Sequence, residues 1–260
     1  MFAQVLTTEF LKLRRSKITW LSWLAFSVMP LAGGLFMWIV MEPQRAAQLG
    51  LLGQKAQLAG VTADWPSYFT MLNQVACVGG MVLLAIIAAY VFGREYSEKT
   101  AKNLLALPVP RHWFVVAKLA VILVWFGILT VSLIAEGLLV GALLRLPGFS
   151  ISLAVSAGGN VLIAGLVGYL LVPIVAWIAT LGRGYLAPIG FTIFMLVMGN
   201  VLGMTGWGKW FPWSIAPMLA GLAGPRSEVL ASGSLVVVGL TFAAGVAATV
   251  WQVRHADNAQ

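Results

Sequence analysis

Few side chains in this 260-residue chain could do chemistry, and many of those that could are gathered in one stretch, residues 93–111. The stretch reads GREYSEKTAKNLLALPVPR and mixes both signs of charge: Arg94, Glu95, Glu98, Lys99, Lys102 and Arg111. Mixed charge of this kind can set the register of a protein–protein contact through charge complementarity. We therefore expect this stretch to recognise a partner protein.

A second set of candidates consists of polar residues inside apolar runs. Glu136 is an acid in such a run, and an acid within a membrane span is by default a functional hypothesis. Asn73 and Asn200 are polar residues in two other runs. We predict a substrate path that includes Glu136, Asn73 and Asn200. The alternative for Glu136 is that its side chain only reaches the membrane interface, and the alternative for the two asparagines is hydrogen bonding between packed helices.

Enzyme chemistry is poorly supported. The single cysteine, Cys77, cannot form an intrachain disulfide, and His112 and His255 stand apart from one another. We expect no catalytic residues and no metal site. The chain also lacks a Gly-x-x-x-x-Gly-Lys-(Ser/Thr) phosphate loop, so it cannot bind ATP in that manner.

Composition places the chain in a membrane. It is 60% hydrophobic and only 9% charged, whereas a soluble domain is about 25% charged. A net charge of +8 could suggest nucleic acid. The tendency of Lys and Arg to collect on the cytoplasmic side of a membrane explains it more simply, so we expect no nucleic-acid partner.

The elements that would position these residues are helices that span the bilayer. A bilayer core of about 30 Å needs roughly 20 apolar residues. We predict an all-α integral membrane fold within a single domain, 1–260, with six spans: 18–41, 68–92, 113–144, 151–180, 185–204 and 232–252. Six spans put both termini on one side. Placing that side in the cytoplasm puts most of the 16 Lys and Arg inside.

Two segments outside the spans have patterns of their own. Residues 1–17 repeat apolar side chains every three or four positions and end in basic ones, which predicts an interfacial helix; a charged flank that only orients the next span is the alternative. Residues 205–231 are aromatic but broken by Pro212, Pro217 and Pro225. We expect one or two short helices there, lying on the outer leaflet or re-entrant.

Residues 93–111 would form a short helix between spans two and three. Gly93 should end the second span, and the pairs Glu95–Lys99 and Glu98–Lys102 have the favourable order for a helix. Pro108 and Pro110 would stop it. An inner loop that only sets the topology is the alternative interpretation.

This stretch resembles, in the form Gly-Arg-Glu-(Tyr/Phe)…Thr…(Leu-Leu)…Pro…Arg, the segment after the second span in permease subunits of type-2 ATP-binding-cassette exporters. The segment TEFLKLRRSKITWLSWLA is similar to the N-terminal part of the bacitracin-resistance and lantibiotic-immunity branch. Together the two segments cover about 40 residues, and the outer half of the chain is not matched.

The resemblance implies a bacterial plasma-membrane permease that pairs with a second permease subunit, as a homodimer or a heterodimer. A separately encoded cytoplasmic ATPase, which binds ATP and magnesium, would drive export of an amphipathic substrate such as a peptide antibiotic or a lipid-associated compound. The family's coupling helix would comprise Arg94, Glu95, Tyr96, Thr100, Asn103, Leu104, Leu105, Pro108 and Arg111.

Two other classes of protein stay open on the sequence alone. An ATP-independent channel or secondary transporter would need charges along a path, and beyond Glu136 the chain offers few. A membrane enzyme would need clustered His, Asp or Glu near one interface, and this pattern is missing from the sequence.

Overall fold

The computed structural model describes residues 1–50, 62–98, 100, 109–222 and 232–255, and within them every regular element is a helix. The helices run in the order α1 (Phe2–Arg14), α2 (Lys17–Met41), α3 (Pro43–Gln48), α4 (Trp65–Ser97), α6 (Arg111–Leu143), α7 (Ile151–Tyr169), α8 (Val172–Leu181), α9 (Leu186–Gly203), the 3-10 turn η1 (Gly208–Trp210), α10 (Pro212–Leu219) and α11 (Ser232–His255).

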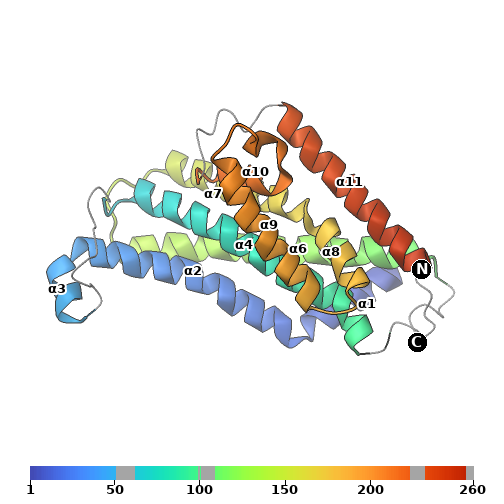
Figure 1. Ribbon diagram of the computed structural model, residues 1–260. Helices are drawn as coiled ribbons and strands as arrows, with labels where there is room; N and C mark the ends of the chain where they lie inside the picture. The colour runs from blue at the N-terminus through green and yellow to red at the C-terminus, as the bar shows by residue number, and fades with distance from the viewer. Residues whose placement is uncertain (51–61, 99, 101–108, 223–231, 256–260) are drawn as a thin grey trace.

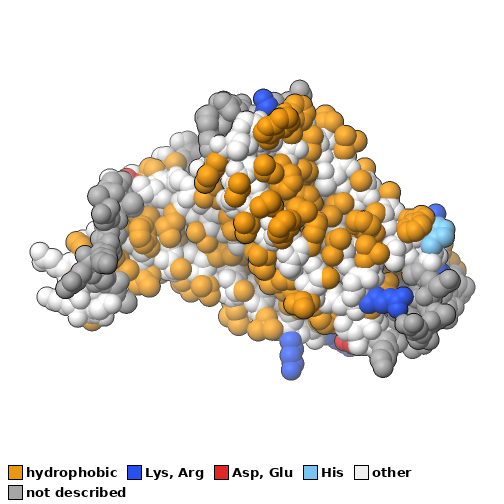
Figure 2. Space-filling model, in the orientation of Figure 1, with side chains coloured by type: hydrophobic (Ala, Val, Ile, Leu, Met, Phe, Trp, Pro, Cys, Tyr) orange, Lys and Arg blue, Asp and Glu red, His pale blue; other side chains and the backbone are white. Residues whose placement is uncertain are grey.

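Six helical segments are long and apolar enough to cross a membrane, as the sequence predicts: α2, α4, α6, the pair α7–α8, α9 and α11. Their outer faces carry exposed Leu, Val, Ile, Phe and Trp side chains. Hydrophobic side chains cover most of the visible surface in Figure 2, with few charges among them. Such a surface suits lipid rather than water. The chain is an all-α, multi-pass integral membrane protein.

Helix α4 forms the centre of the bundle. It packs against α2, α6, α7, α8 and α9, and Figure 1 shows it running obliquely through the middle of the molecule. Two of its side chains, Tyr68 and Ile87, are fully buried. The Tyr68 hydroxyl donates a hydrogen bond of 3.1 Å to the carbonyl of Pro30, inside α2. The core is thus built around this one span.

The prediction that Gly93 ends the second span is wrong. Helix α4 continues through Gly93 to Ser97. A Cβ at residue 93 would lie 2.8 Å from the carbonyl oxygen of Gly184, in the turn between α8 and α9. The glycine is therefore needed for close packing against that turn, and its helix-breaking tendency is overridden. The predicted short helix cannot begin at Glu95, because Glu95 belongs to α4.

The fourth span differs from the single helix predicted for 151–180. It breaks at Leu170 and Leu171, so that α7 ends at Tyr169 and α8 begins at Val172. Pro173 lies in the first turn of α8, where its missing N–H costs no helical hydrogen bond. A proline that was expected to lie within one span marks the start of a second helix.

Residues 205–231 form the short elements η1 and α10 as far as residue 222, and 223–231 lie outside the described residues. Helix α10 is buried along its length by α9, α7, α11 and α4. Trp213 is buried, whereas Trp207 and Trp210 are exposed. Backbone that is too short to span a membrane is thereby covered by protein.

Candidate coupling site at one end of the bundle

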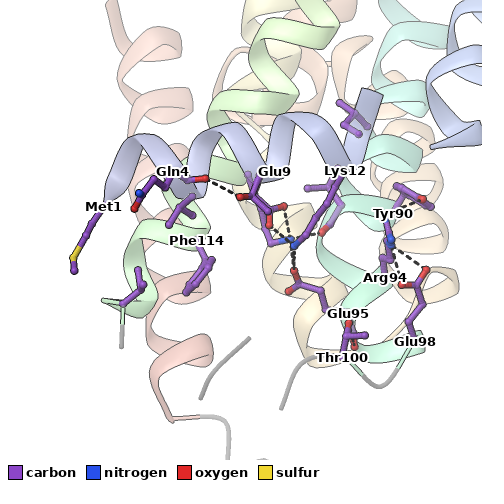
Figure 3. A pocket seen from close by; sticks show the side chains of 16 residues that line it. Met1, Gln4, Glu9, Lys12, Tyr90, Arg94, Glu95, Glu98, Thr100 and Phe114 are labelled. Carbon is purple, nitrogen blue, oxygen red and sulfur yellow. Dashed lines mark hydrogen bonds and ion pairs between the residues drawn. The ribbon is translucent and has the colours of Figure 1, made fainter. Parts of the chain in front are cut away.

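Helix α1 lies across the ends of α4 and α6 and closes one end of the bundle. Val5, Glu9 and Leu13 form its buried stripe, at the helical spacing of four. Phe10 of the same helix is exposed. Figure 3 shows α1 passing over a pocket of about 650 Å³, with lining residues from α1, from the end of α4 and from the start of α6.

A network of ion pairs joins these three helices. Lys118 of α6 donates hydrogen bonds from Nζ to Glu9 Oε2 of α1 at 3.1 Å and to Glu95 Oε1 of α4 at 2.8 Å. A third bond of 2.8 Å reaches the carbonyl of Val91. Lys12 Nζ lies 2.6 Å from Glu9 Oε1 and 3.5 Å from Glu95 Oε1. The four residues Glu9, Lys12, Glu95 and Lys118 are hereafter the ion network.

Three of the four side chains of the network are well shielded from solvent, whereas Lys12 is 34% exposed. Side-chain exposure is 5% for Lys118, 4% for Glu9 and 14% for Glu95. All three ammonium protons of Lys118 have acceptors, so the cost of burying its charge is offset by three bonds. Burial raises the pKa of Glu9, but the charges of Lys118 and Lys12 outweigh it and hold that pKa below its ordinary value. Glu9 therefore stays ionised at neutral pH.

Sequence reasoning found Glu95 but missed the functional candidates Glu9 and Lys118. Both carried a signal. Glu9 stands on the apolar stripe of an amphipathic helix, where an acid needs a buried partner. Lys118 interrupts the otherwise apolar third span five residues after Trp113. A lone acid and a lone base in apolar settings can satisfy one another once the helices pack.

The predicted coupling residues are only partly gathered at this site. Arg94 and Tyr96 lie in the last turn of α4, where Arg94 Nε donates to Glu98 Oε1 at 2.9 Å. Thr100 is exposed, and its N–H donates to the carbonyl of Glu95 at 2.9 Å. Asn103, Leu104, Leu105 and Pro108, with the lysines of the two predicted pairs, lie outside the described residues.

Arg111 has another neighbour. It begins α6, and its Nη1 donates to the carbonyls of Arg254 at 2.9 Å and Val253 at 3.3 Å, in the last turn of α11. A cation at a helix C-terminus satisfies free carbonyls and the negative end of the helix dipole. Arg111 therefore ties the start of α6 to the end of α11.

The three predicted path residues do not meet. Glu136 Oε1 accepts a 2.9 Å hydrogen bond from Ser27 of α2. Asn200 Nδ2 donates to the carbonyl of Leu196 in its own helix at 3.0 Å. Asn73 is buried and lines a separate crevice between α4, α7 and α10. No residue of the described ranges joins a group of three or more His, Cys, Asp or Glu that could hold a metal ion.

Six segments that can cross a membrane and an end helix joined to them by buried ion pairs define a multi-pass integral membrane protein. Comparison with known proteins narrows the class. Residues 5–199 match the family described as "ABC-2 family transporter protein", and the chain belongs to that family. It is also 29% identical over 208 residues to the bacitracin transport permease protein BCRB of Bacillus licheniformis. That match covers 79% of this chain and 99% of the relative. The resemblance to ABC-2 permease subunits seen in the sequence is thus confirmed, and the chain is similar to a bacitracin permease.

Proposed function

We propose that this chain is the membrane-spanning subunit of an ATP-driven exporter that moves an amphipathic peptide antibiotic such as bacitracin out of a bacterial cell. Two copies, or this chain and a second permease, would form the pathway. A separately encoded ATPase would bind ATP and magnesium and dock from the cytoplasm. Both termini, and therefore the α1 end of the bundle, would face the cytoplasm in this arrangement.

The ion network is the observation that carries the proposal. The ATPase-facing segment would be residues 98–110, which join the end of α4 to the start of α6. Lys118 binds α4 and α1 at that point, so a displacement of this segment cannot move one helix alone. The buried ion pairs would pass the motion of a docked ATPase to two spans and to the helix that lies across them.

The family membership and the bacitracin permease relative support the transport role, and the substrate rests on that relative alone. A 29% identity leaves room for a different amphiphile. The pattern in the chain itself adds that Leu104 and Leu105 are adjacent apolar residues in a charged stretch. We propose that they fill a groove on the ATPase, while the surrounding charges set the register.

The test is to purify the chain from its native membrane in mild detergent and to measure ATP hydrolysis and the proteins that come with it. We expect a stoichiometric ATPase with wild type and its loss with Leu104→Asp combined with Leu105→Asp. Leu49→Asp is the matched control, because Leu49 is exposed next to α3 at the other end of the bundle.

Each outcome has a distinct meaning. Retention of the ATPase by the Leu104/Leu105 variant would contradict the docking role of these residues. Absence of any ATPase from a folded wild-type preparation would favour a channel or a secondary transporter. Cells that carry the chain with its ATPase should also survive bacitracin better than cells that carry the docking variant, and equal survival would contradict the proposed substrate.

A further inference from the structure

A small crevice opens at the end of the bundle opposite the ion network. It has a volume of about 280 Å³ and lies between α4, α7 and the end of α10. Asn73 lies eight residues after Trp65, the first residue of α4, and is thus about 12 Å along the helix. Pro66, Thr70 and Ser156 are exposed at the mouth, whereas Asn73 and Ala157 are buried. The crevice therefore has an open mouth and a closed floor.

The floor carries a polar atom that the fold leaves unsatisfied. Asn73 is 8% exposed, and its Oδ1 is a buried side-chain oxygen without a hydrogen-bond partner, the one such atom among the residues that the structure describes. A buried acceptor without a partner is destabilising. Asn73 is one of the residues that line the crevice, so a group bound there is in a position to supply the missing partner.

The two hydroxyls at the mouth have the same character. Thr70 Oγ1 donates to the carbonyl of Pro66 at 2.8 Å, and Ser156 Oγ donates to the carbonyl of Leu153 at 2.9 Å. Their protons are used within their own helices, so each oxygen can only accept a further hydrogen bond. Asn160 also lines the crevice and has an interaction of its own. The described wall is rich in acceptors.

Charge and size restrict the occupant. The described lining contains no Asp, Glu, Lys or Arg, and an ion without a counter-charge is costly to bury. Whole ligands occupy pockets of roughly 300–1,000 Å³, while one water molecule takes about 30 Å³. The crevice suits one polar group of a larger molecule, with its apolar remainder against the exposed helix faces.

We propose that this crevice is a substrate subsite that binds an uncharged hydrogen-bond donor, an O–H or amide N–H group of an amphipathic molecule, through Asn73 Oδ1. The proposal rests on the proposed export function, whose topology places the crevice in the outer half of the membrane. An amphiphile would enter with its donor group against Asn73 and its apolar part along α4 and α7.

The first experiment measures protection of the mouth. The natural chain has one cysteine, Cys77, which is buried, so Ser156→Cys introduces an accessible thiol. Labelling by an uncharged maleimide is followed in lipid nanodiscs with octyl glucoside or with octyltrimethylammonium. The two probes share a tail, but only the first has hydrogen-bond donors. Val155→Cys is the matched control, because Val155 is 70% exposed and does not line the crevice.

We expect octyl glucoside to slow labelling at residue 156 with a saturable dose dependence, and octyltrimethylammonium to have little effect. Neither probe should protect residue 155. Equal protection by both probes, or none at residue 156, would overturn the proposal. Both outcomes are independent of the ATPase, so failure here is distinguishable from failure of the proposed function.

The second experiment replaces the acceptor. Asn73→Leu removes Oδ1 and keeps a similar side-chain volume. The octyl glucoside concentration that gives half-maximal protection of the residue 156 thiol should therefore rise about threefold to tenfold. The apparent Tm should stay the same or rise, because the unpaired acceptor is gone. A falling Tm would show that Asn73 stabilises the fold instead. A higher Tm with unchanged protection would show that the crevice holds water only. Either result would overturn the assignment.

Discussion

The two ends of this bundle differ in whether the chain itself supplies hydrogen-bond partners for the buried polar groups. At the α1 end, Lys118 is almost fully buried and has three acceptors. At the other end, Asn73 is nearly as buried, and its oxygen has no partner. Among the described residues, Lys118 at one end finds all its hydrogen-bond partners within the chain, whereas the Asn73 oxygen at the other end finds none.

The difference separates two tasks that a permease must carry out. A group that must hold helices together gains from having all its partners in the same chain, because the link is then permanent. A group that must bind and release a molecule gains from a hydrogen-bonding position that no residue of the chain fills. We therefore read the ion network as a mechanical link and the Asn73 crevice as a binding site, and the predictions below test that division.

The largest effect is expected from Lys118→Met. This change leaves Glu9 and Glu95 buried and shared by Lys12 alone. Removing one partner of a buried ion pair costs about 3–5 kcal/mol, which corresponds to a fall in apparent Tm of roughly 10 °C in a chain of this size. Thermal unfolding in detergent would measure it.

Two further variants control this result. Arg45→Met removes an exposed ion pair with Glu42, whose side chains are 67% and 44% exposed, and should cost under about 1 kcal/mol. Lys118→Met combined with Glu9→Met removes both buried charges and should recover much of the stability. If the double variant also keeps full ATP-driven transport, the network stabilises the fold but does not transmit motion.

A smaller effect is expected from acid. The pKa of Glu9 is lowered in the folded protein, so its contribution to stability is present above the unfolded value of 4.5 and is lost as pH falls through the folded pKa. Hydrogen exchange of the α1 amides should be unchanged between pH 7 and pH 5 after correction for intrinsic rates. Below about 4.5 it should increase as α1 detaches.

Glu9→Gln is the matched variant for this measurement. It should weaken the α1 contact at all pH values and abolish the acid-dependent step. Protection of the Ser156→Cys thiol by octyl glucoside, taken as a ratio of labelling rates, should not change over the same range, because the described lining of the crevice has no acidic or basic side chain. An acid step that persists in Glu9→Gln would assign it to another group.

Much of the fold could be predicted because the bilayer imposes it. Runs of about 20 apolar residues can only be spans, and all six were found. The errors lie where contacts between helices, rather than the local sequence, determine where a helix ends. Gly93 was expected to end the helix, but α4 continues past it. Glycine is needed at this position because the turn at Gly184 leaves no room for a side chain. The fourth predicted span is found as one membrane-crossing segment, but its helix is interrupted at Leu170 and Leu171, so that it consists of α7 and α8.

The sites were less predictable, because they depend on which helices meet. The charged stretch begins at the end of α4 that carries Glu95, but Glu95 acquires its partners from residues 23 positions later and 83 positions earlier in the chain. Arg111, which was predicted to belong to the coupling segment, also contacts the end of α11, and nothing in the sequence indicated that contact. A single sequence does not state such long-range pairings, although isolated charges in apolar runs show that they must exist.

The smallest effect is expected at Glu136, which lies between the two ends. Substituting it tests whether a polar group outside the ion network and the Asn73 crevice also has a role in transport. Ser27 Oγ donates to Glu136 Oε1, and this bond joins α2 to α6. Glu136→Gln keeps an acceptor oxygen for Ser27, so the apparent Tm should change little, by the equivalent of about 0.5 kcal/mol or less. If Glu136 lines the path, as the sequence predicts, loss of its charge should still change the export rate.

Ser27→Ala supplies the contrast, because it removes the donor and retains the carboxylate: it should lower stability slightly and leave export intact. Unchanged export in Glu136→Gln would make the contact with Ser27 its whole role, and only Asn73 and Asn200 would then remain of the three predicted path residues.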